Sequence, residues 1–316
     1  MTGCGKAPDA VALLVFVSLS GPPVRDHDAS RRCHPNSLSA ASKAIGVPCM
    51  REILEKTSHR PWPLPPGPWS LTQRWNDLLF AHWPMRVAEI EALLPEGLEA
   101  DIFQGSAWLG VVPFWMDRIQ MRGLPKIPGA NKFPELNLRT YVRDRATKSP
   151  GVYFFSLDAA SLIAVIAART IFHLPYHWSQ MSIKPRGDRE FSYYSRRLLS
   201  GRPVRFAARY RGLGPTHKLA QSRPGTIEYF LTERYCLFTQ DSGRRLLRAN
   251  IHHVPWPLEE AEAEIEYNDL PAQVGLTLPD TKPLLHYSRH LAVYVWPAEL
   301  VQQALLRTRP AVAAAQ

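Results

Sequence analysis

The stretch "PELNLRTYV" (134–142) carries polar side chains at alternate positions, namely Glu135, Asn137, Arg139 and Tyr141. Successive side chains of a β-strand point to opposite faces, so these four would share one face and the intervening apolar residues the other. A carboxylate, an amide, a guanidinium and a phenol on one face can bind a small polar molecule and exchange protons with it. A plain solvent face is the alternative. We expect this row to line a cavity.

A second polar group lies in "GVYFFSLDA" (151–159), where strand alternation puts Asp158 on the face of Ser156, Phe154 and Val152. Asp158 is a candidate functional carboxylate. Alternatively, it caps the helix predicted at 160–172, a role that Ser161 could also fill. Arg169 on that helix could pair with Asp158 or with Glu135.

The segment "LPYHW" (174–178) follows this predicted helix directly. It offers the phenol of Tyr176 and the imidazole of His177, two groups that can donate or accept protons. The segment could be a catalytic loop, a turn with polar decoration or the altered form of a site with other chemistry. We include both residues among the candidates for the cavity.

Charged residues also interrupt the apolar stretch "LTERYCLF" (231–238). On the strand that we expect here, Glu233 and Arg234 would point to opposite faces and could not pair with each other. A buried charge needs a partner, so we expect one for whichever of them enters the interior. Arg139 is the expected partner of Glu233, and Glu135 or Asp158 that of Arg234. The alternative puts both charges on a wet exterior.

The elements that must position these residues are mostly strands. Runs such as "VYFF" and "LAVYVW" are β-branched and aromatic, and 29 prolines divide the chain into short elements. Helical spacing appears only at 87–98 and 160–172. We therefore predict a mainly β (α+β) fold in which one closed or strongly curved β domain carries two helices.

The ends of the chain differ from this pattern. Residues 1–49 show neither helical nor strand periodicity, and we expect them to be disordered or to belong to an over-long reading frame with its start at Met50. The run "VALLVFVSLS" (11–20) resembles a signal-peptide core, and a cleaved signal peptide is the alternative. We expect a single domain over residues 50–300 and a tail over 301–316.

Composition argues against several functions. The formal net charge is +10, but the arginines are scattered, so we expect no nucleic-acid partner. The four cysteines form no CxxC pair, which favours reduced thiols in a cytoplasmic protein. His286 and His290 are four apart on a predicted strand, too far apart to share a metal ion. We expect no metal, no cofactor and no membrane partner; whether the chain forms a homo-oligomer stays open.

Several blocks together carry a resemblance, in order from about Met50 to Trp296: "RPWPLPPGPWSLTQRWNDLLFAHWPM", "GSAWLGVVPFWM", "FPELNLRTYVRD", "GVYFFSLDA", "LPYHWSQM", "YYSRR", "LTERYCLF" and "IHHVPWPL". They resemble the bacterial YqjF-like family (DUF2071), which is grouped structurally with acetoacetate decarboxylase. The resemblance implies an acetoacetate decarboxylase-like β-barrel or cone with a few peripheral helices and an internal cavity.

The same resemblance addresses the chemistry of "LPYHW". In acetoacetate decarboxylases, two adjacent lysines follow the helix, and one forms a Schiff base with the substrate ketone. The matching stretch here reads Ala168-Arg169-Thr170 and then Leu174-Pro175-Tyr176-His177, so Tyr176 and His177 replace the lysines. Neither a phenol nor an imidazole can form an imine with a ketone. The resemblance thus implies the cavity without Schiff-base chemistry.

We therefore expect a protein that binds a small anionic or carbonyl-bearing molecule in an internal cavity. The alternative is an acid/base enzyme without a covalent step, of the lyase, isomerase or hydrolase type, acting on a small keto or carboxylic acid. The candidate cavity residues are Glu135, Asn137, Arg139, Asp158, Arg169, Tyr176, His177, Glu233 and Arg234.

Overall fold

The computed structural model describes residues 50–125, 127–214 and 222–301. The expectations for residues 1–49 and for the tail beyond Val301 lie outside these ranges. In the described part of the chain, no helix is both long and apolar enough to cross a membrane.

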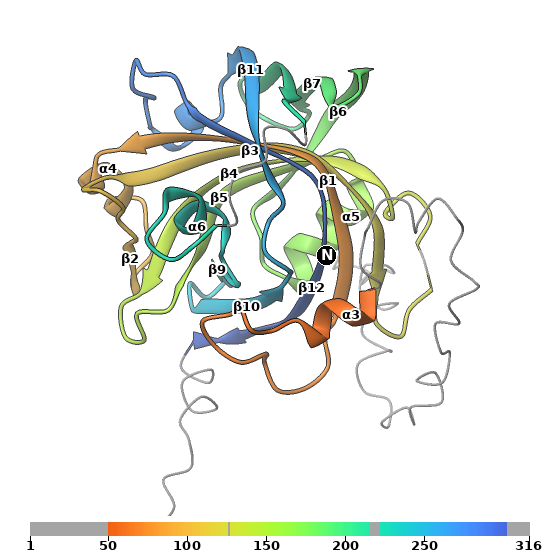
Figure 1. The fold of residues 1–316 in the computed structure, drawn as a ribbon, viewed down its shortest axis with the longest axis vertical. Coiled ribbons are helices and arrows are strands. Elements are labelled where there is room, and N and C mark those ends of the chain that lie inside the picture. Colours follow the sequence, from red (N-terminus) through yellow and green to blue (C-terminus); the bar gives the residue numbers. More distant parts are fainter. Residues whose placement is uncertain (1–49, 126, 215–221, 302–316) are drawn as a thin grey trace, which may run out of the picture. The chain divides into compact units, whose positions relative to one another are not determined.

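Strands dominate the structure, as predicted, and few helices accompany them (Figure 1). The strands are β1 (Leu71–Met85), β2 (Leu98–Ala100), β3 (Ala107–Met121), β4 (Phe133–Asp144), β5 (Pro150–Ala159), β6 (Tyr176–Gly187), β7 (Glu190–Arg197), β8 (Arg205–Gly212), β9 (Cys236–Gln240), β10 (Leu246–His252), β11 (Leu258–Asn268) and β12 (Leu284–Leu300). The helices are α3 (Met50–Glu55), α4 (Val87–Glu91), α5 (Leu162–Ile171), α6 (Ile227–Thr232) and the 3₁₀ turn η2 (Pro271–Val274).

The twelve strands form one sheet that closes on itself. Strands β1, β3, β4, β5, β9, β10 and β12 pair in a ring, because β4 also pairs with β5 and β10 also pairs with β12. The order β5-β6-β7-β8-β11-β12 adds a second arc that starts and ends on strands of the ring. Closure of this kind leaves few open strand edges.

Strands β1 and β4 form part of a wall between two apolar cores. Along β1, Leu78 and Phe80 pack in one cluster, while Leu79 and Ala81 pack in the other. On β4, Leu136 and Leu138 belong to the same cluster as Leu79. Such alternation places the polar row of β4 on the opposite face, toward the cluster of Leu78 and Phe80.

A bulge in β5 changes the faces that the sequence predicts. Leu138 pairs with Ser156, but the next residue, Arg139, pairs with Phe154, so Phe155 is an extra residue on β5. Ser156 and Asp158 therefore lie on the face opposite to Phe154, and the prediction that these residues share one face is wrong.

The helices also differ in detail from the expectation. Helix α5 begins after Ser161, whose Oγ accepts a hydrogen bond from the Ala164 backbone N–H, so Ser161 rather than Asp158 is the cap. Helix α4 covers only the first part of the predicted 87–98, because it ends at Glu91 with Ala92 as its C-cap residue.

The stretch "LTERYCLF" is not the predicted strand. Thr226 caps α6 by accepting a hydrogen bond from the Tyr229 N–H, and this helix runs through Thr232. Glu233 is its C-cap residue, and strand β9 begins only at Cys236. Aromatic and β-branched composition favoured a strand here, and the Thr226 cap shows why a helix forms instead.

Candidate functional site

A cavity of about 190 Å³, partly open to solvent, lies inside the ring of strands. All seven strands of the ring contribute side chains to it, and α5 covers one side with Ile163, Ala164, Ala167 and Ala168. Most of the lining is apolar. Its polar side chains come from Gln73, Glu135, Asn137, Arg139, Tyr176, Thr232, Arg234 and His253, besides the indoles of Trp75 and Trp256.

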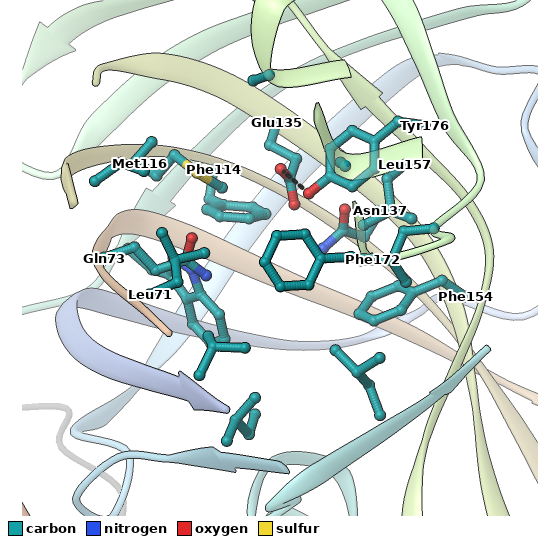
Figure 2. A pocket seen from close by; sticks show the side chains of 18 of the residues that line it. Leu71, Gln73, Phe114, Met116, Glu135, Asn137, Phe154, Leu157, Phe172 and Tyr176 are labelled. Atoms are coloured by element: carbon teal, nitrogen blue, oxygen red, sulfur yellow. Dashed lines mark hydrogen bonds between the residues drawn. The ribbon is translucent and has the colours of Figure 1, made fainter. Parts of the chain in front are cut away.

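Three of the sequence-predicted candidates meet at one side of this cavity. Figure 2 shows Glu135, Asn137 and Tyr176 together, with Phe114 and Leu157 beside them. The Tyr176 hydroxyl donates a hydrogen bond of 2.6 Å to Glu135 Oε2. The strand register explains the meeting, since Asn137 pairs with Leu157 on β5, and Leu157 pairs with Tyr176 on β6. Paired residues on neighbouring strands share a face.

Burial changes the protonation of Glu135. Its side chain is 3% exposed, and loss of hydration raises its pKa from 4.5 to about 8. Hydrogen bonds from Tyr176 and Asn137 oppose this rise, while the nearby Asp158 carboxylate adds to it. Burial and Glu135 together raise the pKa of Tyr176 well above its ordinary value. Near neutral pH, most Glu135 carboxyls are therefore protonated and can donate a hydrogen bond.

Arg139 brings a charge to the same cavity. Its Nη2 donates to the Tyr141 hydroxyl at 3.1 Å and to the Leu231 carbonyl at 3.4 Å, and its Nε has no partner among the described residues. The Tyr141 hydroxyl also lies 2.6 Å from His82 Nε2. Burial and the Arg139 charge hold the pKa of His82 well below its usual range, so His82 is neutral.

Gly110 makes this packing feasible. A Cβ at Gly110 would lie 3.0 Å from His82 Cδ2 and 3.4 Å from Arg139 Cγ. No carboxylate of the described chain forms an ion pair with Arg139. The guanidinium is thus an unbalanced positive charge beside an apolar cavity.

Glu233 and Arg234 are both buried, but with partners other than the expected ones. Arg234 Nη1 lies 2.5 Å from Asp101 Oδ2, so the expected pairing with Glu135 or Asp158 is wrong. Glu233 accepts hydrogen bonds from the Tyr235 hydroxyl and the Trp256 N–H rather than from Arg139. Arg234 lines the cavity and is paired with Asp101, a carboxylate that it shares with Arg143, and Glu233 is not among the lining residues.

The other three candidates lie on the opposite side of the wall. Asp158 is 1% exposed and pairs with Arg197 at 2.8 Å, while its backbone neighbour in the β6 register is His177. His177 and Arg169 line a separate groove. Burial, followed by the charges of Arg197 and Arg169, lowers the pKa of His177 to about 4. The expected pairings of Arg169 with Asp158 or Glu135 do not form.

Cavity residues that the sequence did not single out include two tryptophans and a glutamine. Trp75 and Trp256 stack with ring centroids 5.8 Å apart, and neither Nε1 has a partner in the part of the chain that is described. Gln73 lies across the cavity from Glu135 (Figure 2). Leu71, Gln73 and Trp75 occupy alternate positions of β1, so strand periodicity could have predicted that Gln73 faces the cavity. The loop position of Trp256 gave no such signal.

The comparisons with known proteins agree with this architecture. A sequence model of DUF2071, described as an uncharacterized conserved protein, matches residues 72–292. The uncharacterized protein YqjF of Bacillus subtilis (strain 168) is 45% identical over 234 residues, which cover 74% of this chain and 93% of YqjF. The chain belongs to the DUF2071 family.

Solved structures show the fold that this family member shares with others. The enduracididine biosynthesis enzyme MppR, complexed with the condensation product of pyruvate and imidazole 4-carboxaldehyde, is similar with a TM-score of 0.50 and 12% identity, over 75% of this chain and 90% of MppR. An acetoacetate decarboxylase-like enzyme from Sphingomonas wittichii RW1 gives a TM-score of 0.50 at 13% identity, over 77% and 97% of the two chains. The fold is therefore acetoacetate decarboxylase-like.

Tyr176 and His177, which the resemblance matches to the lysine pair, have different surroundings. Tyr176 points into the cavity, whereas His177, the next residue on β6, faces the other side. Within the described chain, no lysine lines the cavity.

Proposed function

We propose that this protein binds a small organic molecule in the cavity, one with an apolar body and a carboxylate or carbonyl group. The observation that carries the proposal is the unbalanced charge of Arg139 in a cavity whose other ionisable groups are neutral or paired. Glu135 is mostly protonated near neutral pH, burial keeps the pKa of His253 low, and Asp101 pairs with Arg234. A bound carboxylate would neutralise Arg139 in a charge-assisted hydrogen bond.

The volume of the cavity limits the size of the ligand. An apolar cavity of about 150 Å³ can take benzene. About 190 Å³ therefore suits a ring or a short branched chain together with one polar group. The protonated carboxyl of Glu135 would donate a hydrogen bond to a carbonyl oxygen, and the bond that it accepts from Tyr176 holds it in place.

Unsatisfied polar atoms in the lining support binding as well. Trp75 Nε1, Trp256 Nε1, Arg139 Nε and Asn137 Oδ1 are buried and lack partners among the described residues. Each such group costs about 1–3 kcal/mol. A polar ligand that reaches any of them recovers part of this cost.

Chemistry through a Schiff base has no support in the cavity. An imine needs a lysine amine, and Tyr176 occupies the position that faces the cavity. The buried free thiol of Cys236 fits the cytoplasmic location that forms part of this proposal.

The test is calorimetric titration with benzoate and with benzamide, its neutral analogue of similar shape. We expect benzoate to bind more tightly, and Arg139→Gln to weaken benzoate about tenfold while changing benzamide little. Arg209→Gln, which removes an exposed arginine on β8, is the matched control. Equal binding of the two compounds, or an equal effect of the two substitutions, contradicts the proposal.

An acid/base enzyme is the second candidate, and one observation favours it. A carboxyl with a pKa of about 8, hydrogen-bonded to a phenol inside an apolar cavity, can exchange protons near neutral pH. Such a group could remove and return a proton on the carbon next to a carbonyl. Exchange of these protons in phenylacetone for deuterium, followed by NMR in D₂O, would show this activity. It must disappear in Glu135→Gln, and exchange at the uncatalysed rate rules the activity out for this ketone.

A further inference from the structure

Helix α5 and strand β6 also line a second hollow, which is separate from the cavity. While Ile163, Ala164 and Ala167 face the cavity, Leu162, Val165, Ile166 and Arg169 line a groove of about 340 Å³. His177, Trp178, Arg197, Thr170 and Leu199 complete its lining. We call it the α5–β6 groove. Its elements appear together in Figure 1.

Arg197 is a prearranged cation in this groove. Its side chain is buried, with Nε 2.8 Å from Asp158 Oδ1 and Nη2 2.7 Å from Ser156 Oγ. Ser195 adds a further hydrogen bond to Asp158 at 3.3 Å. A guanidinium fixed in this way loses little side-chain entropy when it meets a ligand.

The groove carries a net positive charge. Arg169 and Arg197 bring two positive charges, and Asp158, behind Arg197, balances one of them. Among the described residues, no carboxylate lines the groove. The two arginines also help to keep the imidazole of His177 neutral, so its ring can still donate or accept one hydrogen bond.

Apolar side chains surround these polar groups. Leu199 is 85% exposed, and Leu162 and Ile166 are 43% and 42% exposed. Solvent exposure of three large aliphatic residues beside a cationic centre is unfavourable for a plain surface. It suits a ligand that has an apolar body and an anionic group.

We propose that the α5–β6 groove is a second binding site, which takes an organic anion with an apolar body. The anionic group would lie between Arg169 and Arg197, and the body would cover Leu162, Ile166 and Leu199. This assigns a site to Arg169 and His177, which the cavity leaves unused. It does not depend on what the cavity binds.

Indole resonances can distinguish the two sites in one experiment. The chain has nine tryptophans, of which Trp178 lines the groove, while Trp75 and Trp256 line the cavity. Full-length protein labelled with ¹⁵N-tryptophan would be titrated with 2-naphthoate and, separately, with neutral 2-naphthamide. Trp178→Phe assigns the reporter resonance.

We expect 2-naphthoate to shift the Trp178 resonance saturably and 2-naphthamide to do so only weakly. Arg169→Gln should weaken this binding about tenfold, and Arg169→Lys, which keeps the charge, by less. Arg196→Gln is the control, because Arg196 is exposed, pairs with Gln180 and points to the opposite face from Arg197. It should leave the affinity unchanged.

A Trp178 resonance that does not move overturns the inference, and so do equal effects of Arg169→Gln and Arg196→Gln. Equal binding of 2-naphthamide would also refute the anion site. Shifts of Trp75 and Trp256 with benzoate report on the cavity separately, so failure of one site is distinguishable from failure of the other. An unchanged spectrum of the unliganded Arg169→Gln protein shows that it folds.

Discussion

Replacement of Glu135 by glutamine should change the way in which stability depends on pH. The native pKa of about 8 lies above the ordinary value of 4.5, so the folded protein holds a proton that the unfolded chain releases. The stabilising effect of this proton is complete below pH 4.5 and is lost as pH rises toward 8. The two pKa values differ by about 3.5, and at about 1.36 kcal/mol per pKa unit this corresponds to about 5 kcal/mol of stabilisation of the folded state. Between pH 5 and 8, the loss amounts to about 3 kcal/mol.

The assay is urea unfolding of the wild type and Glu135→Gln at pH 5, 6, 7 and 8, followed by tryptophan fluorescence. Several buried histidines have lowered pKa values, so their protonation destabilises the folded protein as pH falls, which is the opposite pH dependence. This contribution is the same in both proteins and cancels in the difference between their free energies of unfolding. We expect the variant to gain about 3 kcal/mol relative to the wild type over this range. Glu264→Gln, at an exposed position on β11, is the control and should show a constant difference. A constant difference for Glu135→Gln as well would refute the account of Glu135 as a buried, protonated acid.

Three further substitutions test other parts of the structure. Arg197→Met leaves the 1% exposed Asp158 without its counter-charge and should lower the free energy of unfolding by about 3–5 kcal/mol near pH 7. Arg196→Met is the control and should change this free energy by less than about 0.5 kcal/mol in the same urea titration. Gly151→Ala puts a Cβ 2.7 Å from Phe238 and 2.9 Å from the Cys236 carbonyl oxygen, so it should lower the free energy of unfolding by about 1–3 kcal/mol. Gly201→Ala, whose Cβ meets no atom within 4 Å, is the control and should be tolerated. Similar melting temperatures for the two variants would contradict this packing. Tyr176→Phe removes the hydrogen bond to Glu135 and should lower the free energy of unfolding by about 1 kcal/mol. It should also raise the pKa of Glu135 further, which ¹³C NMR of the labelled carboxyl measures. A lowered pKa of Glu135 would show that the phenol does not stabilise the charged form.

Strand alternation predicted much of the site because it depends only on local geometry. The row of Glu135, Asn137 and Arg139 shares the face that the alternation assigns to it, and Tyr176 reaches the same cavity from a strand 40 residues further along the chain. The YqjF-like family and the acetoacetate decarboxylase-like fold were also predicted correctly.

The errors arose where a single residue changes the local geometry. Phe155 is an extra residue in β5, and this bulge turns Ser156 and Asp158 away from the cavity face. Thr226 caps a helix in a stretch whose composition favours a strand, which moves Glu233 and Arg234 out of the expected register. The partner of Arg234 is Asp101, more than 130 residues away along the chain, and no local pattern points to such a pairing.

Crystals soaked with 4-bromobenzoate would test the central claim most directly, because anomalous scattering distinguishes the bromine from the carbon, nitrogen and oxygen atoms of the protein. The account predicts bromine among the apolar side chains of the cavity and the carboxylate within hydrogen-bonding distance of Arg139. A cavity without bromine, or a carboxylate turned away from Arg139, would contradict the assignment of the cavity as an organic-anion site.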